Sequence, residues 1–343
     1  MNIEINNPIE YPGWDALLET SDQTTFFQTA AWARGLSESY GYAPHYFTVI
    51  DGGRLSGLLA VMAIKSCLTG KRGVSLPFSD ECNPVAKDQK TFELLLNESI
   101  AYGQRSGWKY IEIRGGTNFL PNSVAVATHY VHTLELGPDE TGVSRRFKSN
   151  IRRNIHKAEK EGVTVAIERS RDALAAFYRL HCGTRRHHGL PPQPWSFFEK
   201  IYGHIIAAGK GFVALAGYQN RWIAGAVYAL YRDQAIYKYG ASDRRSQHLR
   251  PNNLVMWEAI RWCCRHAVRS FSFGRTEPEN EGLLQFKRGW GASEGTLAYY
   301  RYDLRGDRFV GDTAQANKLN GLFRRMPLPL LRMAGNLLYR HMG

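Results

Sequence analysis

The sequence predicts a mixed α+β fold in which one structural unit occurs twice in tandem. Residues 94–113 read as an amphipathic helix followed by a short alternating strand, and residues 254–273 read the same way at an offset of 160. A second similarity relates residues 53–57 to residues 220–225, and each segment lies just before an expected apolar strand. The matched pairs in the 160-residue frame are Leu94/Leu254, Glu98/Glu258, Ile100/Ile260, Arg105/Arg265, Ile111/Phe271 and Ile113/Phe273. We therefore expect two α/β units.

The length of 343 residues is enough for two domains that each bury a core. We place the first domain at residues 1–143 and the second at 144–316, with residues 317–343 as a tail. In the first domain, residues 45–50 and 55–64 alternate like two antiparallel strands joined by the turn Asp51-Gly52-Gly53. In the second, we expect helices over 172–187 and 195–208 and strands over 211–218, 222–231 and 234–241. Each sheet should be mixed, mostly antiparallel and flanked by helices.

A strongly basic segment opens the second domain. Phe147, Ile151, Ile155 and Ala158 share one helical face, so the spacing predicts a helix over 144–161 that bridges the two copies. Its other faces carry Arg152, Arg153 and further basic side chains. These arginines either contact a substrate or phosphate or form a solvated helix face.

The bulk composition points to an anionic partner. There are 44 lysines and arginines against 31 acidic residues, a formal net charge of +13, which suits a nucleic acid, a phosphorylated carrier or an acidic membrane surface. The five cysteines have no C-x-x-C spacing, so we expect buried free thiols and no metal site. The first residues lack a signal-peptide pattern and no apolar run is long enough to span a membrane, which predicts a cytoplasmic protein.

The tail alternates apolar and basic residues, including Leu330, Leu337, Arg324 and Arg332. Such a segment can lie on an anionic membrane surface, which would place the protein at the inner face of the membrane. The alternative is a C-terminal helix docked on the first domain.

Residues 237–291 hold the densest set of motifs. Residues 237–243 end a strand in small residues, and residues 251–254 begin a helix whose free N–H groups can bind an anion. Residues 273–275 end the next strand, and residues 284–291 close the run. Together they predict a ligand site formed by backbone amides and a helix N-terminus.

These motifs, in this order and spacing, resemble the second domain of FemAB-like proteins, which are built from two fused GNAT-type acyltransferase domains. The resemblance covers nearly the whole chain and implies two tandem GNAT-like domains. It rests on 240–242, 251–253, 273–274 and 286–291, and further on 27–32, 76–78, 152–158, 184–186 and 189–191.

The resemblance implies transfer of an acyl or aminoacyl group from a carrier to an amine, as on a cell-envelope peptide or saccharide precursor. Phe286-Lys287 is the best-matched functional position. In Fem-type enzymes the matching lysine lies at the acyl-donor site, where its charge can hold a phosphate or stabilise a developing oxyanion. We expect Lys287 to be partly exposed and to point into a cleft lined by Tyr239, Asn252 and the basic positions near Arg152.

Other residues are assigned by position. Asp243 and Tyr239 are candidates for the base that takes the proton of the acceptor amine. Tyr237 and Tyr239 should face the same side of their strand, either in the core or lining the site. Arg185-Arg186 are followed by His187-His188. For these four residues we favour contact with a polar substrate over metal binding. The candidate substrate-binding residues are Phe286, Arg152, Arg153, Arg185, Arg186, Tyr237, Asn252 and Asn253.

The donor stays open between acyl-CoA and aminoacyl-tRNA, with no tightly bound cofactor. The chain lacks the glycine-containing pyrophosphate loop of acetyl-CoA GNAT proteins, and its nearest equivalent is Arg244 to Arg250. The predicted partners are therefore an anionic acyl carrier, an amine substrate, tRNA as a second carrier, and an anionic membrane. Two alternatives to an acyltransferase are a non-catalytic nucleic-acid-binding protein and a peripheral membrane protein. No helix-turn-helix, zinc-finger or RRM motif supports nucleic-acid binding.

Overall fold

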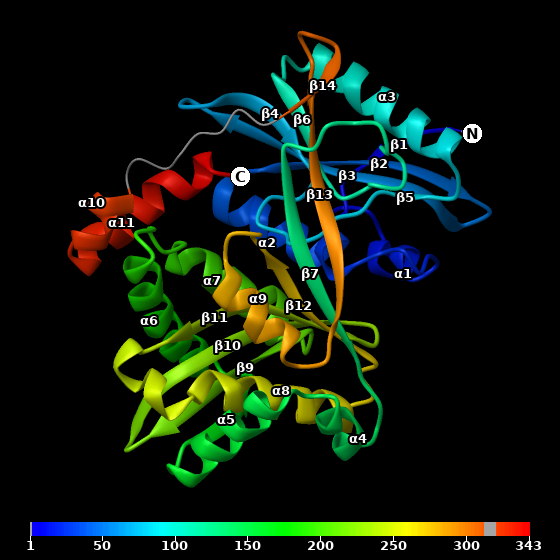
Figure 1. Cartoon of the computed structure of the whole chain (residues 1–343). Helices are drawn as coiled ribbons and strands as arrows, with labels where there is room; N and C mark the ends of the chain where they lie inside the picture. Colours follow the sequence, from blue (N-terminus) through cyan, green and yellow to red (C-terminus); the bar gives the residue numbers. More distant parts are fainter. Residues whose placement is uncertain (1, 312–319) are drawn as a thin grey trace. The chain divides into compact units, whose positions relative to one another are not determined.

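A computed structural model describes residues 2–311 and 320–343 of the chain (Figure 1). These residues divide into two compact units. Unit 1 holds the described residues of 1–129, 296–315 and 338–343, and unit 2 holds those of 130–295 and 316–337.

Unit 1 is a mixed sheet in the order β1-β2-β3-β4-β6-β13, with β14 paired to β13 and β5 paired to β3. The β4–β6 pair is parallel and α3 connects it, whereas the other pairs are antiparallel. The predicted hairpin at 45–64 is confirmed as β2 and β3. The elements are β1 (Glu4–Asn6), α1 (Trp14–Leu18), η1 (Phe26–Gln28), α2 (Ala30–Tyr40), β2 (Ala43–Asp51), β3 (Arg54–Ser66), β4 (Gly70–Val74), β5 (Val85–Ala86), α3 (Gln89–Arg105), β6 (Tyr110–Arg114), most of β13 (Ser293–Asp303), β14 (Arg308–Val310) and η4 (Tyr339–His341).

Unit 2 has the sheet order β7-β12-β11-β10-β9-β8. Here β11–β12 is the parallel pair, connected by α8, and its neighbours are antiparallel. The elements are most of β7 (Ala127–Glu135), α4 (Glu140–Arg145), α5 (Ser149–Lys160), β8 (Thr164–Glu168), α6 (Arg171–His187), α7 (Trp195–Ile201), the π-helix η2 (Tyr202–Ile206), β9 (Gly211–Tyr218), β10 (Arg221–Tyr231), β11 (Gln234–Ser242), η3 (Arg244–Leu249), α8 (Pro251–Arg265), β12 (Ser270–Thr276), α9 (Glu281–Arg288), α10 (Asn320–Arg325) and α11 (Leu328–Leu338).

The two sheets have the same topology, which confirms the predicted fold class. The repeated helix and strand are α3–β6 in unit 1 and α8–β12 in unit 2, and each connects the one parallel strand pair reported for its sheet. The last strand of each sheet, however, comes from the other half of the chain. β7 precedes residue 143 and completes unit 2, while β13 follows residue 144 and belongs mostly to unit 1.

Strand pairing therefore gives the compact units different bounds from the expected domains. The boundaries at 143/144 and 316/317 remain a prediction about the duplicated sequence segments.

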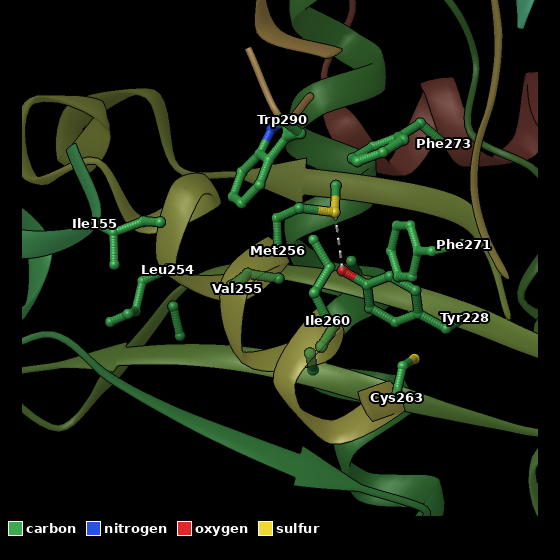
Figure 2. Packing of buried hydrophobic residues seen from close by; sticks show 14 of the residues in the cluster. Ile155, Tyr228, Leu254, Val255, Met256, Ile260, Cys263, Phe271, Phe273 and Trp290 are labelled. Atoms are coloured by element: carbon green, nitrogen blue, oxygen red, sulfur yellow. Dashed lines mark hydrogen bonds between the residues drawn. The ribbon is translucent and has the colours of Figure 1, made fainter. Parts of the chain in front are cut away.

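The core on one face of the unit 2 sheet forms between the sheet, α8 and α5 (Figure 2). Met256 and Ile260 of α8 pack with Phe271 of β12, and all three are at most 2% exposed. Ile155 of α5 joins the same cluster, and the Tyr228 hydroxyl lies 3.9 Å from the Met256 sulfur. Figure 2 shows Met256 and Ile260 beside Tyr228 and Phe271, and Ile155 on the side of Leu254. These contacts hold α8 against the sheet.

The basic segment at 144–161 is not one helix, and that prediction is wrong. α4 ends at Arg145 and α5 begins at Ser149, because Lys148 is extended and its N–H donates to the Gly289 carbonyl at 2.8 Å. This break places Phe147 against Trp257 and Trp290. Both helices lie within unit 2.

The tail is helical where it is described. In α11, Leu331 is fully buried and Gly335 leaves no room for a side chain, because a Cβ there would lie 2.1 Å from the Pro192 carbonyl oxygen. The guanidinium of Arg332 lies 5.6 Å from the centre of the Tyr178 ring. α11 is thus docked within unit 2.

The end of the tail, η4, docks on unit 1 as the alternative expected. There the Tyr42 hydroxyl donates to the Tyr339 carbonyl at 3.1 Å, and Arg72 donates to the His341 carbonyl at 2.8 Å. None of the helices in the described ranges is long and apolar enough to cross a membrane.

Candidate active site

A cavity of about 880 Å³ opens in unit 2 where β11 ends and α8 begins. α6 forms one wall of this cavity through Arg179, Gly183 and Arg186, which share one helix face at spacings of four and three. We call it the primary cavity. Its lining residues are Arg179, Leu180, Gly183, Thr184, Arg186, His187, His188, Tyr237, Gly240, Ala241, Ser242, Asp243, Arg244, Arg245, Gln247, Asn252 and Arg324.

The primary cavity lies beside a separation of two parallel strands. β11 and β12 pair only over residues 234–236 and 270–272. Beyond these residues β11 stays paired with β10 up to Ser242, while β12 pairs with β7 up to Thr276. Strands that diverge in this way leave backbone groups that lack strand partners at their carboxyl ends, the usual position of ligands in sheets with parallel strands.

The lining is strongly cationic. Five arginines line the primary cavity, namely Arg179, Arg186, Arg244, Arg245 and Arg324, and Asp243 is the only carboxylate among its described lining residues. Asp243 is already paired with Arg245, at 2.8 Å from Nη2 to Oδ2. Arg179 and Arg186 have no ion pair within the part of the chain that the structure describes. Such a surface attracts a ligand with several negative charges.

Neutral groups complete the lining. The hydroxyl of Tyr237 occupies the space above Gly240, where a Cβ would lie 1.7 Å from it, so only glycine fits there. Burial raises the pKa of Tyr237 to about 12, which keeps its phenol protonated. Asn252 in the first turn of α8 donates to the Ser242 hydroxyl at 3.3 Å. Burial, and then the nearby His187, Arg185 and Arg324, lower the pKa of His188, which is neutral near pH 7 and able to accept a proton.

Comparisons with known proteins assign the fold around this cavity. Residues 145–288 match the family model described as an acetyltransferase (GNAT) domain. Over 76 residues, 20% of this chain, the sequence is 29% identical to the lipid II:glycine glycyltransferase of Staphylococcus haemolyticus strain JCSC1435. The structure resembles FemX, with a TM-score of 0.69 at 16% identity over 89% of this chain and 98% of that one. Residues 145–288 are thus a GNAT-type acetyltransferase domain.

A second structural relative supports the tandem architecture. The fold resembles a tandem GNAT protein from the clavulanic acid biosynthesis pathway, with a TM-score of 0.56 at 8% identity over 88% of this chain and 98% of that one. At identities this low, the two structural similarities indicate the fold alone. The matched segment spans only 18% of the curated glycyltransferase.

The primary cavity brings together some of the predicted site residues and leaves others outside. Arg186, Tyr237, Asp243 and Asn252 line it together. Asn253 is buried beneath the first turn of α8, and its Nδ2 has no hydrogen-bond partner among the described residues. Arg185 turns away from the cavity and donates to the Pro191 carbonyl at 3.3 Å.

Tyr239 faces the opposite side of the sheet from Tyr237, so the predicted common face is wrong. The β10–β11 register shifts between Val227 and Tyr228, and this bulge places one extra residue, Lys238, in β11. Tyr239 therefore packs on His181 and on Phe198 of α7. It does not line the primary cavity.

Lys287 lies in neither the predicted position nor the predicted environment. It is 2% exposed, and its ammonium donates to the carbonyls of Gly274 at 2.8 Å and Arg275 at 3.1 Å. It thus holds the end of β12, the strand that separates from β11, and does not line the primary cavity. The preceding Phe286 packs edge-on against Trp290 of the core.

The arginines of α5 also lie outside the primary cavity. Arg152 donates to the carbonyls of Arg145 and Phe147 at 3.2 and 2.7 Å, so it helps to close the end of α4. Arg153 is exposed. The expected cleft that joins Lys287, Tyr239, Asn252 and Arg152 is therefore not formed within unit 2.

Sequence reasoning did not assign Arg179 and Arg324 to the site, and it named Arg244 and Arg245 only as part of the nearest equivalent of a pyrophosphate loop. The helical spacing from Arg179 to Arg186 could have found the first, since both lie on the face of α6 that lines the cavity. Arg324 comes from α10, far along the chain, and no local pattern links it to β11. No group of three or more histidine, cysteine or acidic side chains in the described residues could hold a metal ion.

Proposed function

We propose that this protein is an acyltransferase that moves an acyl or aminoacyl group from a phosphate-bearing carrier to an amine. The observation that carries the proposal is the primary cavity. It combines five arginines with one already paired carboxylate, at the point where two parallel strands of a GNAT domain separate. Guanidinium groups bind phosphates through charge-assisted hydrogen bonds, often in pairs.

The reaction needs one new bond and one proton transfer. The amine nitrogen attacks the acyl carbon, the bond from that carbon to the carrier sulfur or oxygen breaks, and the carrier leaves with a proton. The amine loses a proton in the same sequence. Among the cavity residues, His188 can accept that proton because it is neutral near pH 7. The paired Asp243 is a poor base, because hydrogen bonds from Arg245 lower its pKa further.

The acceptor is proposed to be an amine of a cell-envelope peptide or saccharide precursor. The support is the sequence match to a protein named lipid II:glycine glycyltransferase. The donor carrier is either coenzyme A or tRNA, and both present phosphates to the same cationic lining. The GNAT domain favours an enzyme over a non-catalytic nucleic-acid-binding protein.

The cavity arginines provide the test. Arg186→Ala and Arg244→Ala should each raise the Kd for the carrier about tenfold, the loss expected for one hydrogen bond to a charged group. Titration calorimetry of the full chain with acetyl-CoA and with a short aminoacylated RNA would measure this. Arg305→Ala is the matched control, since Arg305 is exposed in the turn after β13. Wild-type affinity in both cavity variants would overturn the proposal.

A second proposal concerns an apolar stripe on the exposed side of α11. Leu330, Met333 and Leu337 are 53%, 60% and 68% exposed and lie at spacings of three and four, on one side of the helix. The opposite side is docked through Leu331 and Gly335, and the exposed Arg324 and Arg325 of α10 precede it in the chain. We propose that this stripe lies in the headgroup region of an anionic membrane.

Changing Leu330, Met333 and Leu337 together to serine should reduce sedimentation with phosphatidylglycerol vesicles several-fold, because about 0.8 kcal/mol is lost for each buried methylene group. Leu68→Ser is the matched control, a single exposed leucine of unit 1. Unchanged vesicle binding by the triple variant would contradict the proposal. Loss of a dimer in light scattering instead would assign the stripe to contact between copies.

A further inference from the structure

A second cavity of about 630 Å³ adjoins the primary cavity in unit 2. The two share Arg179, Leu180, Asp243 and Arg245 among their lining residues, so they are neighbours along the same wall. The second cavity extends toward the hairpin of β9 and β10. Nothing in the acyl-transfer chemistry described above uses it.

The floor of the second cavity includes an exposed indole. Trp222 is 44% exposed, and it is the only aromatic side chain among the large hydrophobic residues exposed in the described ranges. It pairs across the hairpin with Gly217, and its Cζ3 and Cε3 atoms lie 3.3 and 3.5 Å from the position that a Cβ on Gly217 would take. The glycine lets the ring rest against the strand and leaves ring surface free on the cavity side.

The rim around this indole is cationic. Arg179, Arg221, Arg245 and His248 line the second cavity, and its one carboxylate among the described lining residues, Asp243, is paired with Arg245. Arg221 has no ion pair in the described part of the chain. A large exposed aromatic surface next to free cations suits a ligand that is both flat and anionic.

We propose that the second cavity is the base-binding subsite of a nucleotide whose phosphates lie in the primary cavity, with Trp222 stacking on the base. The inference rests on the proposed acyltransferase function and assigns the base of the donor carrier to the second cavity. The same chemistry is present in a small nucleotide-bearing carrier and in the end of an RNA. Stacking on the base accounts for the exposed indole of Trp222. Arg179 and Arg245 line both cavities, so they can contact the ligand between its base and its phosphates.

The test distinguishes binding of the base from binding of the phosphates. Adenosine 3′,5′-bisphosphate and pyrophosphate are titrated into the full chain, its Trp222→Ala and Trp222→Phe variants, and Arg186→Ala. Trp222→Ala should raise the Kd for the nucleotide about tenfold, within the range for losing one stacked base, and leave the Kd for pyrophosphate unchanged. Trp222→Phe should restore most of the affinity because it keeps a ring. Arg186→Ala should weaken both ligands.

The outcomes distinguish the two proposals. Equal nucleotide affinity in Trp222→Ala and the wild type, with pyrophosphate still dependent on Arg186, overturns the subsite and leaves the acyltransferase standing. No binding of either ligand overturns both. A trinucleotide ending in adenosine that binds more tightly than the bisphosphate assigns the subsite to an RNA end, and the reverse order assigns it to a small carrier.

Discussion

Replacing Lys287 by alanine is expected to lower the free energy of unfolding by about 3 kcal/mol, since it leaves two buried carbonyls without their charged donor and opens a cavity. The ammonium is buried on the carbonyls of Gly274 and Arg275, at the end of β12. Urea unfolding followed by circular dichroism measures the loss. Lys160→Ala, at an exposed position of α5, should leave the stability unchanged and serves as the control.

The same variant tests whether the lysine takes part in catalysis. Because Lys287 lies outside the primary cavity, acyl transfer per folded molecule should stay near the wild-type value when the lysine is replaced. Lys287→Met keeps the length of the side chain, removes its charge and should cost less stability than alanine. A fall of roughly 10²–10³ in folded Lys287→Met, the effect of removing one donor to an oxyanion, would instead support the catalytic role implied by the sequence resemblance. Full activity of folded Lys287→Met would remove the catalytic assignment and leave Lys287 as a residue that holds the end of β12.

Below about pH 6, the protein should lose about 1.4 kcal/mol of stability per pH unit because of His181 alone. This histidine is 5% exposed, it lies among Phe177, Phe198 and Tyr239, and neither ring nitrogen has a partner among the described residues. Burial, and then the charge of Arg185, lower its pKa to about 3. Between this value and the ordinary 6.5 the unfolded chain binds a proton that the folded chain does not, so stability falls as the pH falls.

The difference between variants isolates this contribution from the other histidines. His181→Leu should unfold with a shallower pH dependence between pH 7 and pH 5, and at pH 7 it should be no less stable, because it removes two unpartnered buried polar atoms. His156→Asn, at an exposed site in α5, should keep the wild-type slope. Equal slopes in wild type and His181→Leu would show that the imidazole is protonated in the folded state.

The fold could be predicted from the sequence because its signals are local. The repeat of a helix and strand at 94–113 and 254–273 identifies the two crossovers that connect the parallel strand pairs, α3–β6 and α8–β12. The turn at Gly52 and Gly53 identifies the hairpin of β2 and β3. Each signal needs only the residues of one segment.

The site was only partly predictable from the sequence. The predictions that were wrong concern residues whose positions depend on contacts with distant parts of the chain. One extra residue at Lys238 turns Tyr239 to the opposite face from Tyr237, and alternation along the sequence gives no sign of such a bulge. The environment of Lys287 depends on carbonyls of β12, more than ten residues earlier in the chain. The break in the helix at Lys148 depends on a hydrogen bond to Gly289.

Because each sheet takes its final strand from the other half of the chain, synthesis constrains the order in which the two sheets can be completed. The sheet of unit 1 needs β13, which leaves the ribosome only after all strands of unit 2 have been synthesised. Until β13 has been synthesised, the sheet of unit 1 has an unpaired edge at β6. An unpaired edge promotes aggregation and binding by chaperones. The gene also cannot be cut between its two repeats without depriving both sheets of a native strand.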